Sequence, residues 1–179
     1  LHNLNIDEWH LKGTFFCRKY KFLSLKLIVD QKPKLYIDIG CGLGELLSKV
    51  KLNPNYKLGY DKDKKIKKAN LILHRNKFRY FSSEKNLIKH ANELKIKSND
   101  LILISMLNFV HNLSPRELKE LIKKYLKNIG PYTLLIDNIF KKEKVYKYNH
   151  HRYLVNHDGL IKYLYKVDNL RSLYCIKIK

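Results

Sequence analysis

The sequence predicts an α/β domain built on a mostly parallel sheet. Five short apolar runs between residues 35 and 137 alternate with helix-like segments, as parallel strands and crossover helices do. A glycine-rich turn follows the first run, and two strand-like segments close the chain. With 179 residues, of which 45% are hydrophobic and 12% aromatic, the chain is large enough to bury a core. We therefore expect one folded domain.

The first half of the chain is expected to begin with a helix. Apolar residues recur at helical spacing from Phe16 onward, which predicts a helix over 14–30. Pro33 separates this helix from a first strand over 35–39. The elements expected next are a helix over 45–50, a strand over 56–60, a helix over 64–73, a strand over 78–81 and a helix over 84–94.

The second half contains two more predicted parallel strands and a hairpin. The run 101–105 has no alternation, which is typical of a strand buried on both faces. Ser114, Pro115 and Glu117 have the spacing of a helix N-terminus, and the helix is expected to end at Gly130. A strand over 132–137, an irregular basic region over 138–156 and an antiparallel hairpin of 159–167 with 172–178 complete the list.

The turn after the first strand reads Asp-Ile-Gly-Cys-Gly-Leu-Gly over residues 38–44. Glycine tolerates positive φ and has no Cβ, so the backbone can turn sharply and approach a ligand closely. The following helix start offers free N–H groups and a positive dipole end, which favours a nucleotide-type cofactor. The third glycine comes one position too early for the dinucleotide fingerprint, and no Gly-Lys-Ser/Thr follows as in a P-loop.

This turn resembles the first motif of class I S-adenosylmethionine-dependent methyltransferases, acidic-x-Gly-x-Gly-x-Gly. Asp61, 21 positions after Gly40, stands where that family places an acid on the ribose hydroxyls. The run 100–111 is similar to the family's central motif, and the closing hairpin to its sixth and seventh strands. The resemblance covers 33–179 and implies a Rossmann-like, seven-stranded, mostly parallel sheet with an antiparallel C-terminal hairpin and helices on both faces. It also implies one domain over 1–179, in which 1–32 is a helical cover.

The resemblance implies S-adenosylmethionine as the cofactor. The residues expected around it are Asp38, Gly40, Cys41, Gly42, Gly44, Asp61, Ser82, Ser83, Ser105 and Met106. A carboxylate at Asp61 can bind two ribose hydroxyls through charge-assisted hydrogen bonds. The adenine would lie near Ser82 and Ser83, where many family members have an Asp and this chain has Ser-Ser-Glu.

The methyl acceptor is expected at the carboxyl ends of the fourth and fifth strands. Methyl transfer needs alignment and often a base, and histidine has a suitable pKa. The catalytic candidates are His111 and Asp137, although His111 could equally cap or pack against the helix near Ser114. The residues expected at the acceptor are Trp9, Asn108, Tyr148, His150, His151 and Arg152, and for Trp9 core packing is the favoured alternative.

Several acceptor chemistries are disfavoured by what the sequence lacks. It has no Asn/Asp-Pro-Pro-aromatic motif for amino groups and no Pro-Cys or Thr-Cys for cytosine C5, which favours an oxygen acceptor. The neighbouring His150 and His151 would point apart, so no metal site is expected. A looser similarity to small bacterial methyltransferases of polysaccharide or secondary-metabolite pathways, carried by 7–10, 108–112, 146–153 and 171–174, implies a small or saccharide-linked acceptor.

The net charge of +21 is the second conspicuous feature. Such a charge attracts RNA, anionic lipid headgroups or phosphorylated substrates. The lysines are spread along the chain and no RNA-binding module is recognisable, so solvated lysine faces are favoured and an RNA methyltransferase is the alternative. A second alternative is a non-catalytic methyltransferase-fold binding module. The three unpatterned cysteines and the absence of a signal peptide or an apolar run of about 20 residues favour a cytoplasmic protein without a membrane span.

Overall fold

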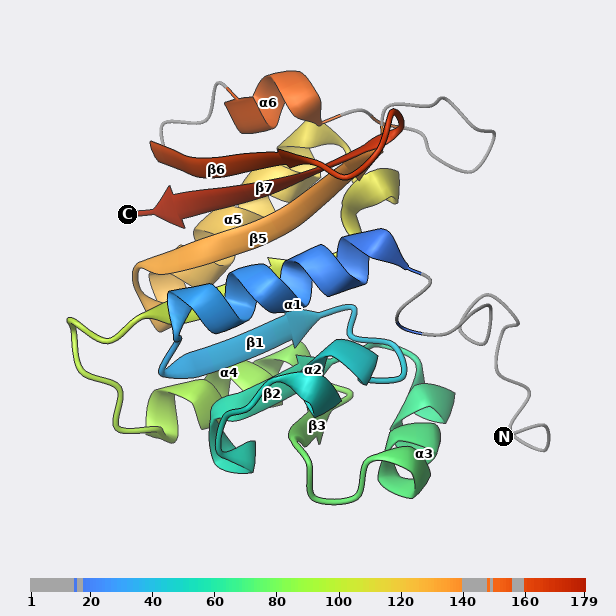
Figure 1. Cartoon of the computed structure of the whole chain (residues 1–179). Coiled ribbons are helices and arrows are strands. Elements are labelled where there is room, and N and C mark those ends of the chain that lie inside the picture. Colours follow the sequence, from blue (N-terminus) through green and yellow to red (C-terminus); the bar gives the residue numbers. More distant parts are fainter. Residues whose placement is uncertain (1–14, 16–17, 140–147, 149, 156–159) are drawn as a thin grey trace.

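The computed structural model describes residues 15, 18–139, 148, 150–155 and 160–179. Its centre is a seven-stranded sheet in the order β3-β2-β1-β4-β5-β7-β6 (Figure 1). Strands β1 to β5 run parallel, whereas β7 is antiparallel to both β5 and β6. The predicted fold class, a mostly parallel sheet closed by an antiparallel hairpin, is confirmed.

The strands are short, as parallel strands between crossover helices usually are. Their bounds are Leu35–Ile39 for β1, Lys57–Tyr60 for β2, Arg79–Phe81 for β3, Ile102–Met106 for β4, Tyr132–Ile139 for β5, Leu160–Lys166 for β6 and Arg171–Ile178 for β7. The helices are α1 (Lys19–Gln31), α2 (Glu45–Lys49), α3 (Lys64–Leu73), α4 (Glu84–Glu93), α5 (Pro115–Ile129) and α6 (His151–Val155), with 3-10 turns η4 (Pro54–Tyr56) and η5 (Val110–Asn112).

Two apolar layers hold the helices against the two faces of the sheet (Figure 1). Leu27 and Leu47 of α1 and α2 pack with Leu103 and other residues that point to one face. Leu87 and Ile122 of α4 and α5 pack on the opposite face. Helices therefore cover both faces of the sheet. The central strands β1, β4 and β5 are shielded from solvent along their whole length.

The helix predicted at Ser114 forms with the expected cap. The Ser114 side chain accepts a hydrogen bond from the Glu117 N–H, the Glu117 carboxylate accepts from the Ser114 N–H, and Pro115 is the first helical residue. Gly130 ends the helix at φ 95°. Local capping chemistry thus fixed both ends of α5.

The structure departs from the predicted elements at several places. Helix α1 begins at Lys19, not at 14, and η4 takes the first residue expected in β2 because Pro54 starts a tight turn. Strand β5 extends to Ile139 since its antiparallel partner pairs with it up to Arg171. The region expected to be irregular contains the short helix α6. None of the helices in the described part of the chain is long and apolar enough to cross a membrane.

Candidate functional site

The turn between β1 and α2 is shaped by three glycines in the left-handed region. Gly40, Gly42 and Gly44 have φ of 72°, 50° and 65°. A Cβ on Gly40 would lie 2.4 Å from Cδ2 of Phe109, and a Cβ on Gly44 would lie 2.2 Å from Cζ of Phe78. Both conformation and space therefore require glycine at these two positions.

Neighbouring elements hold this glycine turn in place. The N–H groups of Gly40 and Cys41 donate to the Tyr60 carbonyl at 2.8 and 3.0 Å. The Asn70 amide of α3 donates to the Gly42 carbonyl at 2.8 Å, and the Gly42 N–H donates to Asp61 Oδ2 at 3.0 Å. The structure thus brings Asp61, which follows β2, into contact with the turn, as the order of the motifs predicted.

Asp38 lies at the end of β1 and is 5% exposed. The Ser105 hydroxyl of β4 donates to Asp38 Oδ1 at 2.5 Å, and the Tyr36 hydroxyl lies 2.8 Å from Ser105 Oγ. Burial raises the pKa of Asp38 to about 7, although the bond from Ser105 and the charge of Lys21 oppose this rise and Asp61 adds to it. Near neutral pH, Asp38 can therefore gain or lose a proton.

A cavity of about 310 Å³ opens beside the glycine turn. Its lining residues are Arg18, Tyr20, Lys21, Asp38, Gly40, Cys41, Gly42, Leu43, Glu45, Leu46, Leu107, Asn108 and Arg171. Helix α1 supplies one wall, where Lys21 forms an ion pair with Glu45 of α2, and Arg18 lies 3.7 Å from the same carboxylate. No motif pointed to these wall residues, because the contact between α1 and α2 is set by packing.

A second group of polar residues gathers at the carboxyl end of β5, around the fully buried Asp137. Asp137 Oδ1 accepts a hydrogen bond from the Asn108 N–H at 2.7 Å, and Asp137 Oδ2 lies 3.2 Å from Arg171 Nη1. Arg171 Nη2 also donates to Asn108 Oδ1 at 3.2 Å. Asn108 has φ 53°, which its short amide side chain tolerates. The predicted residues Asn108 and Asp137 are thus brought together, by an arginine that sequence reasoning missed.

His111 lies behind this group. It is 2% exposed, and its Nε2 lies 3.7 Å from Asp137 Oδ1. Burial lowers the pKa of His111, the charge of Asp137 opposes this, and Arg171 and His150 lower it further. The imidazole is therefore neutral near pH 7, although His111 does not line the cavity.

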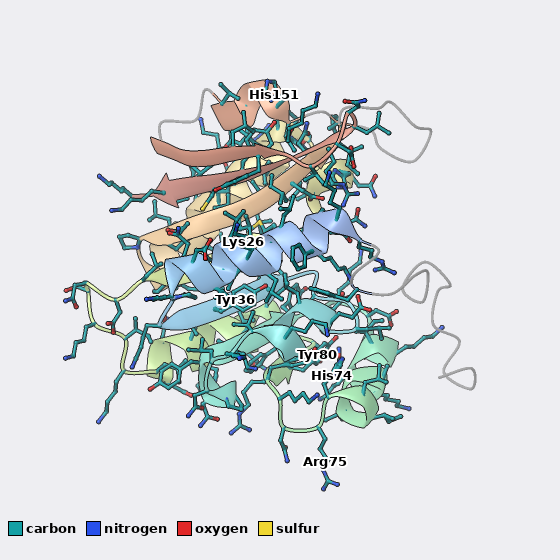
Figure 2. The ribbon with its side chains drawn as sticks, viewed as in Figure 1. Lys26, Tyr36, His74, Arg75, Tyr80 and His151 are labelled. Atoms are coloured by element: carbon teal, nitrogen blue, oxygen red, sulfur yellow. The ribbon has the colours of Figure 1, made fainter. Side chains whose placement is uncertain are left out.

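The two histidines after β5 point apart, as predicted. The His150 N–H donates to Asn138 Oδ1 at 2.8 Å, and His150 Nε2 lies 3.1 Å from the Val110 carbonyl. His150 is fully buried and does not line the cavity, so its contact with an acceptor stays a prediction, whereas its bond to Val110 holds η5. His151, on α6, forms a hydrogen bond with the Tyr174 hydroxyl. In Figure 2, His151 lies at the opposite end of the molecule from Tyr80.

The remaining predicted acceptor residues lie at the surface or outside the described part of the chain. Tyr148 is exposed, and its N–H donates to the His111 carbonyl at 3.3 Å. Trp9 and the side chain of Arg152 lie outside the described residues. Among the described side chains, no three His, Cys, Asp or Glu residues gather as a metal site requires.

Six of the ten predicted cofactor residues do not line the cavity; these are Gly44, Asp61, Ser82, Ser83, Ser105 and Met106. Met106 is fully buried in the layer under α4 and α5, so its prediction as a cofactor contact is not supported; its neighbour Leu107 lines the cavity instead. Strand alternation explains this shift, since successive side chains point to opposite faces. Ser82 is exposed after β3, and Ser83 caps α4 through the Asn86 N–H. Their proposed contact with adenine remains a prediction.

The fold is shared with solved methyltransferases. No protein-family model and no curated protein sequence matches the chain. The structure is similar to the N-methyltransferase NodS from Bradyrhizobium japonicum WM9, with a TM-score of 0.69 and 14% identity over 98% of this chain and 94% of that one. It is also similar to magnesium protoporphyrin IX methyltransferase from Synechocystis PCC 6803, with a TM-score of 0.62 and 12% identity over 90% of this chain and 79% of that one.

A third similar structure is an S-adenosylmethionine-dependent methyltransferase from Clostridium acetobutylicum ATCC 824, with a TM-score of 0.60 and 13% identity over 96% of this chain and 95% of that one. At these identities the comparisons establish the fold. The chain has the class I methyltransferase fold, as the glycine motif and the closing hairpin indicated.

Proposed function

We propose that the protein is an S-adenosylmethionine-dependent methyltransferase. The observation that carries this proposal is the glycine turn at positive φ, framed by Asp38 and Asp61 and open to a cavity of about 310 Å³. Among proteins of this fold, NodS was crystallised with S-adenosyl-L-homocysteine and the Synechocystis enzyme with SAM. Their ligands support the choice of cofactor.

The residues present fit such a cofactor. The turn lets a ligand approach the backbone where a Cβ would block it, and Asp61 has a carboxylate for the ribose hydroxyls. Asp38 and Lys21 offer opposite charges to an amino acid group within one cavity. When bound, S-adenosylmethionine supplies an electrophilic methyl group. The described part of the 1–32 segment, α1, supplies a wall of the cavity, which supports its proposed role as a cover.

We further propose an oxygen acceptor of small or saccharide-linked type, with His111 as the base. Burial keeps the His111 imidazole neutral near pH 7, so that its ring can take a proton. Asp137, 3.7 Å away, would stabilise the protonated ring. Asn108 and Arg171 line the cavity and would position the acceptor.

Cofactor binding tests the first proposal. Titration calorimetry with S-adenosylhomocysteine is expected to show binding, and Asp61→Ala should weaken it at least about tenfold, because a charge-assisted bidentate contact is lost. Asp30→Ala, which removes an exposed acid of α1, is the control and should bind normally. Absence of binding, or equal affinity in Asp61→Ala and the parent, would favour a non-catalytic module.

Methyl transfer tests the acceptor class. Transfer from labelled S-adenosylmethionine to hydroxylated saccharides is expected, and His111→Asn should lower kcat by about 100-fold with little change in cofactor affinity. The alternative is RNA methylation, which the +21 charge favours. Transfer to RNA with steeply salt-dependent binding would replace the saccharide proposal.

A further inference from the structure

The strongest concentration of positive charge lies on α3 and the turn that leads to β3. Residues 64–79 contain seven lysines and arginines and no Asp or Glu. The seven are Lys64, Lys65, Lys67, Lys68, Arg75, Lys77 and Arg79, and all of them are exposed. Figure 2 shows Arg75 projecting away from the body of the protein below α3. No other stretch of 16 residues in the sequence contains seven cations without an acid.

The same helix end exposes three large aliphatic side chains in a row. Leu71, Ile72 and Leu73 are 58%, 69% and 40% exposed. Scattered single apolar residues on a surface need no explanation, but a contiguous exposed group rimmed by charge marks an interaction site. We call these three residues, together with the seven cations of 64–79, the α3 patch.

The exposure of the α3 patch does not arise from a loosely placed helix. Ile66 and Ala69 on the inner side of α3 are fully buried, and Asn70 is bonded to the Gly42 carbonyl. The inner face therefore already provides the packing that holds α3 at the edge of the molecule (Figure 1). This packing does not bury the aliphatic side chains of the last turn of α3, which face solvent.

The chemistry of the α3 patch favours a lipid surface over a nucleic acid. Single-stranded nucleic acids are bound by cations together with exposed aromatic rings on which bases stack. Here neither nearby phenyl ring is fully exposed: Phe78 is 8% exposed, and the partly buried Tyr80 is fixed by its hydroxyl, which donates to the carbonyls of Asp61 and Asp63. Aliphatic side chains surrounded by lysine and arginine instead match the boundary between acyl chains and anionic headgroups.

We propose that the α3 patch docks the protein on membranes that carry anionic phospholipids. Leu71, Ile72 and Leu73 enter the headgroup boundary, and the surrounding cations contact the lipid phosphates. The helix that docks, α3, also supports the wall of the cavity, because its Asn70 side chain is bonded to the glycine turn. The contact is peripheral and reversible, and it does not depend on whether the protein transfers methyl groups.

Sedimentation with vesicles tests this proposal without any cofactor. The full chain is mixed with vesicles of phosphatidylcholine alone or with about 30% phosphatidylglycerol, a composition that gives a strong negative surface. We expect binding to the anionic vesicles only, weakened by salt. Leu71→Glu/Ile72→Glu should weaken binding at least about tenfold, since both apolar insertion and charge attraction are lost.

Two matched variants separate the contributions. Val29→Glu replaces an apolar side chain of α1 that is 51% exposed and should bind as the parent does. Leu71→Ser/Ile72→Ser keeps the charge of the α3 patch, so a loss of binding there shows that insertion matters. Circular dichroism melting checks that each variant is folded.

Two results would overturn the proposal. One is equal vesicle binding by Leu71→Ser/Ile72→Ser and the parent, which would leave only non-specific attraction by the net charge. The other is absence of binding to anionic vesicles while a single-stranded RNA binds and protects the lysines of α3 from chemical modification. Because both measurements are made on the free protein, they are independent of the cofactor-binding test.

Discussion

The two halves of the cavity are built by different means. The half around the glycine turn takes its shape from three positive φ angles, and its anchors are the Tyr60 carbonyl, the Asn70 amide and the Asp61 carboxylate. In the half around Asp137, this buried carboxylate of β5 pairs with the partly exposed Arg171 of β7 and accepts from the N–H of Asn108 in the loop after β4. The turn itself is formed by the consecutive residues 38–44, whereas the second half joins residues 63 positions apart.

The two halves should therefore respond differently to substitutions. At a glycine with positive φ and no space for a Cβ, any other residue strains the backbone, so substitutions in the turn should act through strain. Removing one member of a buried charge cluster lowers the stability of the protein, because the other members are left desolvated and unpaired. Five predictions distinguish these responses, from the largest expected effect to the smallest.

Removal of the Asp137 carboxylate should have the largest effect on stability. Asp137→Ala is expected to lower the free energy of unfolding by about 3–5 kcal/mol, since Arg171 and the Asn108 N–H lose a buried partner. Urea denaturation measures this change. The control is Glu93→Ala, whose pair with Lys89 at 3.9 Å is exposed and should contribute little. Similar losses in both variants would show that the cluster does not act as a buried unit.

A side chain at Gly40 should have a smaller effect on stability. Gly40→Ala is expected to cost about 2 kcal/mol, because alanine is disfavoured at φ 72° and its Cβ would overlap the Phe109 ring. Phe109→Ala in the same chain should remove the overlap and leave the backbone strain. A double-mutant cycle in urea separates the two contributions. Additive effects of the two substitutions would contradict the close contact.

Cofactor affinity should rise with pH through the ionisation of Asp38. A cationic sulfonium ligand favours the carboxylate, and with a pKa of about 7 the affinity should rise about tenfold from pH 6 to pH 8. Calorimetry in buffers of different ionisation enthalpy should also detect proton release. Ser105→Ala should move the rise to higher pH, because the serine hydrogen bond stabilises the carboxylate. A flat profile would mean that Asp38 does not face the ligand's charge.

Without the ligand, the same group affects stability with the opposite sign. The pKa of Asp38 is raised from 3.8 to about 7 on folding, so the folded state binds more protons than the unfolded state between these values. The contribution of Asp38 to stability therefore falls as pH rises from about 4 to about 7. Asp38→Asn should remove this part of the pH dependence in urea denaturation.

The contact between Tyr20 and Arg171 should have the smallest effect. The Arg171 guanidinium carbon lies 4.0 Å from the centre of the Tyr20 ring. Tyr20→Leu is expected to lower the free energy of unfolding by about 1 kcal/mol, whereas Tyr20→Phe keeps the ring and most of the stability. Tyr56→Leu, whose ring lies 5.3 Å from Lys34 Nζ, is the comparison and should cost less. An equal loss in Tyr20→Phe would assign the effect to the hydroxyl.

The sequence was most informative where structure is decided by neighbours in the chain. The glycine turn, the capping box at Ser114 and the bounds of β1 and α3 follow from residue conformations, hydrogen-bonding groups and periodicity within a few positions. The hairpin of β6 and β7 was also predictable, because its two strands are consecutive. The methyltransferase fold could therefore be expected from sequence.

Sequence reasoning was weakest for residues whose place depends on packing. Met106 and His150 were expected at ligands, yet one points into the core and the other is bonded beneath η5. A residue's position along the chain does not say which way its side chain points, so the burial of these two side chains could not be predicted. Arg171, which lines the cavity, was part of a motif of the looser similarity but was not predicted as a site residue.

What the sequence by itself determined is the turn and its two acids, since φ preference and the absence of a Cβ are properties of glycine wherever it stands. Only the tertiary structure decided that α1 forms a wall of the cavity and that Arg171 meets Asp137. The physical reason is that these contacts form between elements far apart in the chain, and their partners are chosen by sheet order and by burial. The environment that raises the pKa of Asp38 is likewise a product of the folded core.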